Sequence, residues 1–497
     1  MQTARTTRPD ARWVVAAIAL AAFLLRLPGL TGPPGADESG FLIVARTWDP
    51  QPDSLFGPYF VDRPPLLLLV IRLADAVGGL TAVRLLGALS CAVLVLTAAA
   101  CARLIAGRRA PAWVAVCVAA ATSTPLIDPV HVKGELLGIP FVMAGCWLAL
   151  LALRRESAGL ALLAGALASL AVGLKQNLLG ALVFAAVLLV GSVLSGRISG
   201  RVFTRLALAG LLGAALHPAV TVAWAQWAGV DLATLWHTVV SFRAEASEVL
   251  SSRPSKSAEI RAWALLAVGV LTGIFAVLAC FLALLPVQWR INAPLTAAIA
   301  AMCAYDVLAV VVSGSYWLDY LFALIPVTAL AASALIGSLD PGSAVIPAAV
   351  GAVVLSCTVG MVAWLVFSPA WISSIHADDT GRAIGEVSQP GDTLVVYGGQ
   401  ADIQLTSGLS SPYTHLWSLP MRTLDPDLDE LTELVEGPDA PTWLVEAAYF
   451  GAWNQEAGAR LRAAVREKYD DVVPECGDAQ RIWRLKSADR ATPQPAC

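Results

Sequence analysis

The amino-acid sequence predicts an all-α polytopic membrane protein with a small α/β domain in its C-terminal region. Of its 497 residues, 57% are hydrophobic and 14% are charged, whereas soluble domains have about half apolar and about a quarter charged residues. Uncharged windows of about 20 residues, enough to cross a hydrocarbon layer of about 30 Å as helices, recur from Trp13 to about Phe367. The polar region after them has the alternating pattern of a globular unit.

About eleven windows qualify as transmembrane helices. Their approximate limits are residues 13–30, 81–106, 110–126, 136–153, 158–173, 178–195, 206–227, 262–286, 292–313, 317–337 and 344–367. Short loops rich in Arg and Lys remain on the cytoplasmic side. Basic residues precede the first window and follow the second, fourth, sixth and eighth: Arg5, Arg8, Arg12, Arg108, Arg109, Arg154, Arg155, Arg197, Arg201, Arg205 and Arg290. A cytoplasmic N-terminus places all of them inside.

We expect two domains: a transmembrane domain of residues 1–368 and a C-terminal domain of residues 369–497. With a cytoplasmic N-terminus, an odd number of spans places the C-terminal domain outside the cytoplasm, on the same side as the outer loop, residues 31–80. The interval from Pro64 to Gly79 is apolar but short, so we expect a helix lying in the membrane interface.

The sequence pattern of the C-terminal region differs from that of the spans and predicts a small extracytoplasmic α/β domain. Strand-like runs occur at 393–397 and 442–445, and a helical run occurs at 455–468. Its role is either scaffolding or acceptor recognition.

The net charge and the cysteines exclude few classes of function. The net charge of −4 and the lack of a basic run indicate no nucleic-acid partner. Seven of the nine cysteines lie in apolar windows, where we expect small buried side chains without chemistry. Cys476 and Cys497 lie in the polar tail, where a disulfide is one alternative.

Two clusters in the outer loop are candidates for chemistry. The first has adjacent carboxylates, Asp37 and Glu38. One reading is a helix N-terminus, with Asp37 as the cap and Glu38 in the first turn, which would stabilise the helix by about 0.5–2 kcal/mol.

The second cluster places Asp62 and Arg63 directly before two prolines. Proline keeps Arg63 extended, so its guanidinium is either presented to a phosphate or snorkels to lipid headgroups.

Further charges lie at the expected outer ends of spans. Lys175 stands out because lysine is scarce, and a charge at the membrane edge indicates function, with interfacial anchoring as the alternative. Arg243 lies in an expected outer loop, residues 236–245. A further loop carries a group that either contacts substrate or is simply solvated: His131, Lys133 and Glu135.

The motifs in this order resemble the C-type (GT-C) glycosyltransferase superfamily, and within it the protein O-mannosyltransferases and the lipid A aminoarabinose transferase (bacterial family 39-like). The resemblance rests on Asp37-Glu38, on the aromatic-x-acid-base-Pro-Pro segment 60–65, on Gly-Leu-Lys-Gln at 173–176 and on tail segments at 390–399 and 407–413. Bacterial relatives often carry a His-Tyr pair at the start of a late span. This chain instead has Tyr-Trp-Leu-Asp-Tyr at 316–320, with Asp319 as the substitute candidate.

The resemblance implies an inverting transferase that moves a mannose- or arabinose-like monosaccharide from a polyprenyl phosphate to an envelope glycan, lipid or protein on the outer face of the plasma (inner) membrane. It makes Asp37 the general base, Arg63 and Lys175 the donor-phosphate ligands, and Arg243 a further candidate ligand. Glu38 and Asp62 would orient Asp37, bind acceptor hydroxyls or, as hard oxygen ligands, hold a divalent cation. No His/Cys metal spacing occurs, and the resemblance implies no metal or other cofactor. Candidate acceptor or sugar contacts are Tyr59, His131, Glu135, Tyr316 and Asp319.

Two other classes of function compete with this interpretation. A transporter or lipid flippase would carry charges or broken helices near the membrane midplane and often inverted repeats, whereas here the charges lie at the outer edges. A non-catalytic scaffold that presents the tail to a partner would leave the two loop motifs without a purpose.

Overall fold

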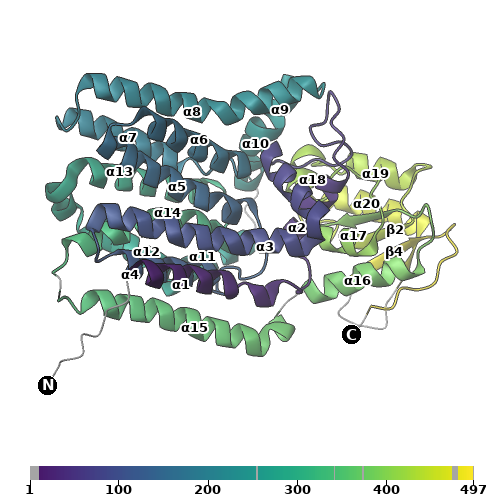
Figure 1. The fold of residues 1–497 in the computed structure, drawn as a ribbon. Coiled ribbons are helices and arrows are strands. Elements are labelled where there is room, and N and C mark those ends of the chain that lie inside the picture. The colour runs from purple at the N-terminus through teal and green to yellow at the C-terminus, as the bar shows by residue number, and fades with distance from the viewer. Residues whose placement is uncertain (1–10, 253–255, 341, 372–373, 473–479, 496–497) are drawn as a thin grey trace.

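The computed structural model describes residues 11–252, 256–340, 342–371, 374–472 and 480–495. These residues form a long bundle of helices with a smaller domain of helices and strands at one end (Figure 1). The expected positions Cys476 and Cys497 lie outside the described residues.

Seven helical stretches among the described residues are long and apolar enough to cross a membrane. They are α1 (Ala11–Leu24) with the turn η1 (Leu27–Gly29), α3 (Pro65–Ala106), α5 (Gly134–Arg155), α8 (Gly200–Trp227), α13 (Leu285–Val312), η3 (Leu318–Tyr320) with α14 (Leu321–Ser338), and α15 (Val345–Trp371). A multi-pass membrane protein follows from these helices together with the fold comparisons given below.

The other apolar helices are bent or short. The pair α11 (Lys256–Leu271) and α12 (Ile274–Ala283) is bent by 73° and would make an eighth span. The remaining three are α4 (Pro111–Ser123), α6 (Ala158–Leu174) and α7 (Gly180–Leu194). Each of the eleven expected windows falls on one of these apolar helices or on the bent pair. Because three helices have fewer than 18 residues, eleven crossings stay a prediction.

The structure bears on two local expectations about the outer loop. The interval expected to form a separate helix is the first part of α3, and a kink with non-helical geometry at Gly78 and Gly79 separates it from the second span. Its place in the membrane interface stays a prediction. Gly79 has φ +62°, which glycine tolerates because it has no Cβ. The helix after the first span, α2 (Ala36–Arg46), is capped by Gly35, so the expectation of Asp37 as the cap is wrong. Asp37 and Glu38 both lie in its first turn.

The expected outer loop 236–245 is helical. The segment consists of α9 (Leu232–Trp236), a π-helical turn η2 (His237–Ser241) and α10 (Phe242–Ser252). No glycine or proline interrupts residues 232–252, so nothing in the chain stops the helix once it has begun. Arg243 is therefore carried by a regular helix.

The C-terminal domain has a sheet with the strand order β1-β2-β4-β3. β1 and β2 are parallel, while β4 is antiparallel to β2 and to β3. Its elements are α16 (Ser374–Val387), β1 (Leu394–Tyr397), α17 (Ala401–Ser407), α18 (Ser418–Leu424), α19 (Asp429–Glu436), β2 (Trp443–Glu446), α20 (Gln455–Lys468), β3 (Tyr469–Val472) and β4 (Arg481–Leu485). The expected strands and helix coincide with β1, β2 and α20.

The C-terminal domain contacts the outer loop through backbone and side chains. The amide of Phe60 donates to the carbonyl of Thr414 over 3.1 Å. Gly40 in α2 lies so close to Trp417 that a Cβ there would meet its ring at 2.2 Å. The domain therefore packs directly on the helix that carries Asp37, and it delivers Trp417 to that place.

Candidate active site

Asp37 lies at the end of the bundle where the C-terminal domain is attached. Lys133, the residue before α5, places its Nζ 2.9 Å from Asp37 Oδ2. Trp417 Nε1 donates to Asp37 Oδ1 over 2.9 Å. The same Lys133 Nζ lies 3.2 Å from Oδ1 of Asp319 in η3. Two segments far apart in the sequence thus contact the Asp37 carboxylate, and a third contacts its ammonium partner.

Arg63 lies beside this carboxylate. Its guanidinium is 5.7 Å from the ring centroid of Phe41, which follows Asp37 by one helical turn on the same face of α2. Arg63 Nη1 contacts Asp62 Oδ1 over 2.6 Å, and the other oxygen of Asp62 lies 2.6 Å from Arg243 Nε. Asp62 therefore holds two guanidinium groups side by side.

Lys175 supplies a further cation. It caps the C-terminal end of α6 and points its Nζ to Glu135 Oε1 over 2.7 Å, with the ring of Tyr320 at 5.6 Å. The next residue, Gln176, donates to the backbone carbonyl of Asp62 over 2.7 Å. This bond ties the end of α6 to the segment that carries Arg63, so the three cations of the donor-phosphate prediction are gathered in one cluster: Arg63, Lys175 and Arg243.

The charges in this cluster act on one another. Burial raises the pKa of Asp37, but the positive charges of Lys133 and Arg63 outweigh burial and hold the pKa well below its ordinary value. Burial lowers the pKa of Lys133, yet Asp319 and Asp37 raise it well above its ordinary value. Burial and the charge of Arg63 lower the pKa of Lys175. The lowered pKa keeps Asp37 ionised. The three cations Arg63, Lys175 and Arg243 are paired with only two acids, Asp62 and Glu135.

Glu38 points away from this cluster into the protein. Its carboxylate lies 2.8 Å from Arg84 Nη2 and also accepts the amide of Val132 over 2.8 Å. Arg84 in turn donates to four carbonyls at the end of η1 and in the loop after it: Gly29, Leu30, Gly32 and Pro33. Because both side chains are saturated and buried, their contacts are those of a structural link. The catalytic role expected for Glu38 stays a prediction.

The other expected contact residues are spread around the site. His131 pairs with Asp128 over 3.1 Å, and its ring packs against Gly35 at the start of α2. Tyr59 exchanges hydrogen bonds with Ser411 of the C-terminal domain, with its hydroxyl as acceptor and donor. The hydroxyl of Tyr316 donates to the carbonyl of Val311. Tyr59 thus serves the domain contact in this structure, whereas His131 borders the segment that carries Asp37.

Sequence reasoning missed two residues of this arrangement, Trp417 and Arg84. Trp417 lies in the tail, and no sequence pattern links it to Asp37. Arg84 interrupts an apolar window of the second span, and a charge at such a place is a signal that sequence reasoning could have used. Lys133 is a candidate for substrate contact in the sequence analysis, but its ion pair with Asp37 is not predicted there.

The described residues contain no group of three or more His, Cys, Asp or Glu side chains able to hold a metal ion. The acids of the cluster are instead paired with Lys and Arg: Asp37 with Lys133, Asp62 with Arg63 and Arg243, and Glu135 with Lys175.

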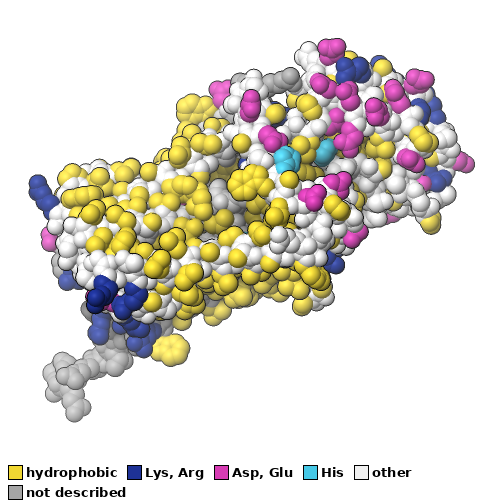
Figure 2. Space-filling view, turned by 90° about the horizontal axis from the view of Figure 1, so that it is seen from above, with side chains coloured by type: hydrophobic (Ala, Val, Ile, Leu, Met, Phe, Trp, Pro, Cys, Tyr) yellow, Lys and Arg dark blue, Asp and Glu magenta, His cyan; other side chains and the backbone are white. Residues whose placement is uncertain are grey.

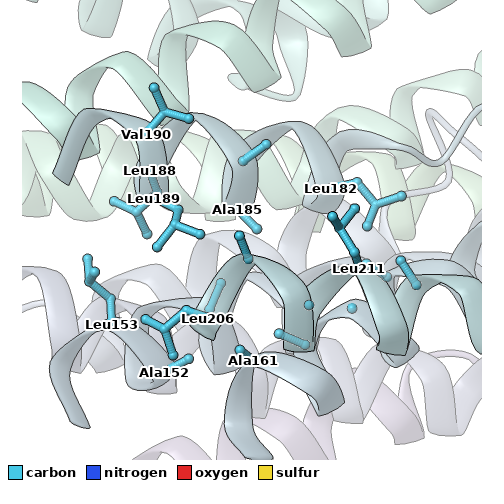
Figure 3. Close-up of a pocket in the computed structure, with 18 of the residues that line it drawn as sticks. Ala152, Leu153, Ala161, Leu182, Ala185, Leu188, Leu189, Val190, Leu206 and Leu211 are labelled. Carbon is cyan, nitrogen blue, oxygen red and sulfur yellow. The ribbon is translucent and has the colours of Figure 1, made fainter. Parts of the chain in front are cut away.

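An apolar cavity of about 380 Å³ lies elsewhere in the bundle, between α5, α6, α7 and α8 (Figure 3). Its lining on α6 reaches Ala168, seven residues before Lys175, which is a separation of roughly 10 Å along the helix. None of the charged residues of the cluster lines the cavity.

The fold can be compared with known structures. It is similar to ArnT from Cupriavidus metallidurans bound to undecaprenyl phosphate, with a TM-score of 0.61 and 16% identity, covering 96% of this chain and 99% of that one. It is also similar to the oligosaccharyltransferase of Archaeoglobus fulgidus, with a TM-score of 0.55 and 13% identity, covering 98% of this chain and 76% of that one. That archaeal protein in complex with an inhibitory peptide and a dolichol-phosphate gives a TM-score of 0.54, 14% identity and coverage of 96% and 74%.

No protein-family profile matches the chain, and no curated protein matches it by sequence. The structures therefore define the class: this chain has the fold of the GT-C membrane glycosyltransferases, as the motifs predicted. Within that class, ArnT matches this chain almost from end to end, whereas the chain spans about three quarters of the archaeal protein. At these identities the likeness is one of fold.

Proposed function

We propose that the protein is an inverting glycosyltransferase that moves a monosaccharide from a polyprenyl-phosphate donor to an acceptor hydroxyl of the cell envelope. The observation that carries the proposal is the cluster itself, in which the Asp37 carboxylate lies near the charges of Arg63 and Lys175. Arg243 joins this cluster through Asp62, which it shares with Arg63. The neighbouring structures whose titles name undecaprenyl phosphate and dolichol-phosphate support a lipid-linked donor.

In the proposed reaction the acceptor oxygen attacks the anomeric carbon of the donor sugar. The bond from that carbon to the phosphate oxygen breaks with its electron pair, and the departing polyprenyl phosphate gains negative charge. The acceptor proton passes to Asp37, which needs to approach the hydroxyl within about 2.6–3.2 Å. Asp37 is suited to this step because its side chain keeps 29% of its surface exposed.

The departing phosphate needs fixed cations where its charge develops. Arg63 binds Asp62 through Nη1 only, and no hydrogen bond to its Nη2 or Nε is found among the described residues. Arg243 lies on the other side of Asp62. Two guanidinium groups held by one carboxylate are fixed in place before the donor arrives, which is the arrangement that stabilises a transition state without reorganisation.

The site is proposed to face the extracytoplasmic side of the plasma membrane. Lys and Arg side chains gather at the end of the bundle remote from the C-terminal domain, while acidic side chains cover that domain (Figure 2). Basic residues stay on the cytoplasmic side, so the domain and the cluster beside it belong to the opposite side. Mannose- and arabinose-like sugars are the proposed donors, and an envelope glycan, lipid or protein is the proposed acceptor.

The experiment that tests this function uses purified protein in liposomes with radiolabelled polyprenyl-phosphate mannose or arabinose and an envelope extract as the acceptor source. We expect transfer with the wild type and a loss of about 10²–10⁴-fold in Asp37→Asn, because the general base is removed. Asp53→Asn, in the same outer loop but exposed, is the matched control and should keep the wild-type rate. Undiminished transfer by Asp37→Asn would remove Asp37 as the base, and no transfer with any donor would contradict the function.

A further inference from the structure

Lys133 creates a problem for a base at Asp37. Its ammonium lies 2.9 Å from Asp37 Oδ2, and Trp417 Nε1 already occupies Oδ1 at 2.9 Å. A carboxylate that is bound to an ammonium is a weak base, because the cation stabilises the ionised form that must accept the proton. The same cation stabilises Asp37 before an acceptor binds, since a partly buried carboxylate without a partner would be costly.

Asp319 offers a second place for the same ammonium. Its Oδ1 lies 3.2 Å from Lys133 Nζ, its side chain is buried, and Lys133 is its only hydrogen-bond partner among the described residues. A lysine has a flexible four-carbon stem and three donors, so a small rotation would shift the ammonium fully onto Asp319. Asp319 is held in the turn η3 at the start of α14, so its carboxylate has a fixed place.

The surroundings favour this shift when substrate is present. The Lys133 ammonium also lies 5.8 Å from the ring of Trp317 and contacts Asp37 on α2. An acceptor hydroxyl that approaches Asp37 Oδ2 takes the position that Lys133 holds. The ammonium then remains paired only if it moves to Asp319.

We propose that Lys133 is a switchable counter-ion, which pairs with Asp37 before an acceptor binds and moves to Asp319 when an acceptor hydroxyl enters against Asp37. Lys133 is thus a positioning residue, and Asp319 is its second partner. The inference rests on the proposed function because it assigns Asp37 the role of base. The switch also gives a reason for Asp319 at the position where the resemblance led us to expect a histidine, because an acid there can pair with Lys133.

The first test is a double-mutant cycle with the donor that supports wild-type transfer. In Asp319→Asn the ammonium has no second partner and stays on Asp37, so we expect kcat to fall at least about tenfold with little change in donor KM. Removing the cation as well, in Lys133→Gln/Asp319→Asn, should restore kcat to within about threefold of Lys133→Gln alone. Lys256→Gln, an exposed lysine on α11, is the matched control and should keep the wild-type kcat.

A double variant that is no faster than Asp319→Asn would overturn the switch, because a merely structural role makes the two losses add. Wild-type protein that transfers no sugar would contradict the proposed function instead, so the two failures can be told apart. In that case the switch is still tested by a measurement without turnover.

The second test measures acetylation of Lys133 by acetic anhydride, followed by peptide mass spectrometry, which is simple with five lysines in the chain. An ammonium that is held in an ion pair with a carboxylate is acetylated slowly. Because either acid can hold it, we expect Asp37→Asn and Asp319→Asn each to leave the rate within about twofold of wild type, and the double variant to raise it at least about fivefold. Full release by one of the single substitutions would show that Lys133 has one partner only and would overturn the inference.

Discussion

Asp37 and Glu38 are neighbours in the chain, yet they belong to two ion-pair sites of different character. Glu38 and Arg84 leave 1% and 2% of their side chains exposed, and their polar atoms are used by backbone and side-chain partners. Asp37 and Lys133 leave 29% and 21% exposed, and the ammonium is divided between two acids. A saturated buried pair can only hold the chain in place. A partly open pair with exchangeable partners can respond to a ligand.

The strongest test of this comparison is Glu38→Ala. Removing one partner of a buried pair leaves Arg84 unpaired, and we expect a loss of about 3–5 kcal/mol in the free energy of unfolding. Thermal unfolding in detergent, with Asp37→Asn measured beside it, should show a large decrease for Glu38→Ala and little for Asp37→Asn. Glu38→Leu/Arg84→Met removes both charges and should lose less than Glu38→Ala alone. A stable Glu38→Ala protein without activity would assign Glu38 to the chemistry.

The next effect concerns Arg63. Arg63→Gln should lower transfer by about 10²–10³-fold, because one fixed donor to the developing phosphate charge is lost. The same substitution at Arg46, which forms an exposed pair with Asp75, is the matched control and should change transfer by less than about twofold. Equal losses in both variants would mean that Arg63 serves the interface and not the donor.

A smaller effect is expected at Trp417. Trp417→Phe keeps most of the packing against Gly40 and removes the Nε1 hydrogen bond to Asp37. A hydrogen bond to a charged group contributes about 1.5–3 kcal/mol, so we expect kcat to fall about tenfold or more while donor KM stays near the wild-type value. Trp227→Phe, at a ring that is largely exposed on α8, should have no effect. An unchanged kcat in Trp417→Phe would separate the C-terminal domain from the chemistry.

The last test extends the comparison to Asp402 on α17, which packs against α2. Burial raises the pKa of Asp402 to about 6. An acid whose pKa is raised in the folded state favours folding below its ordinary pKa and loses that contribution as the pH rises through about 6. Asp402→Asn carries no charge, so it should be more stable than wild type at pH 8, by on the order of 3 kcal/mol, and should differ from it by less than about 1 kcal/mol at pH 4.

Thermal midpoints at pH 4 and pH 8 and equal scan rates would check this prediction. Asp439→Asn, an exposed acid in the same domain, should show no such difference between the two pH values. A difference of the opposite sign would mean that Asp402 is paired in its ionised form.

Much of the fold could be predicted because transmembrane helices are encoded in local composition. The eleven windows coincide with apolar helices, since each must satisfy its backbone within one segment of chain. The outer loop was less predictable. The break at Gly78 and Gly79 follows from the two glycines themselves, whereas the helical conformation of residues 236–245 depends on packing that local sequence does not encode.

In the candidate site, the sequence pattern identified Asp37, Arg63 and Lys175 because each stands out in an apolar or proline-rich context. Trp417 could not be found in this way. Its role comes from a domain contact, and tryptophan in a polar tail looks like an ordinary core residue. Likewise, the local sequence could not distinguish the role of Asp37 from that of Glu38. The two acids differ in their ion-pair partners, Lys133 and Arg84, which reach α2 from other segments.

The hydrogen bond between Trp417 and Asp37 joins residues 380 positions apart. During synthesis the acid is made early, and its aromatic partner leaves the ribosome only after the spans have been inserted. A nascent chain therefore lacks this hydrogen bond until residue 417 has been made, so the surroundings of Asp37 are completed only after the spans before it have been synthesised.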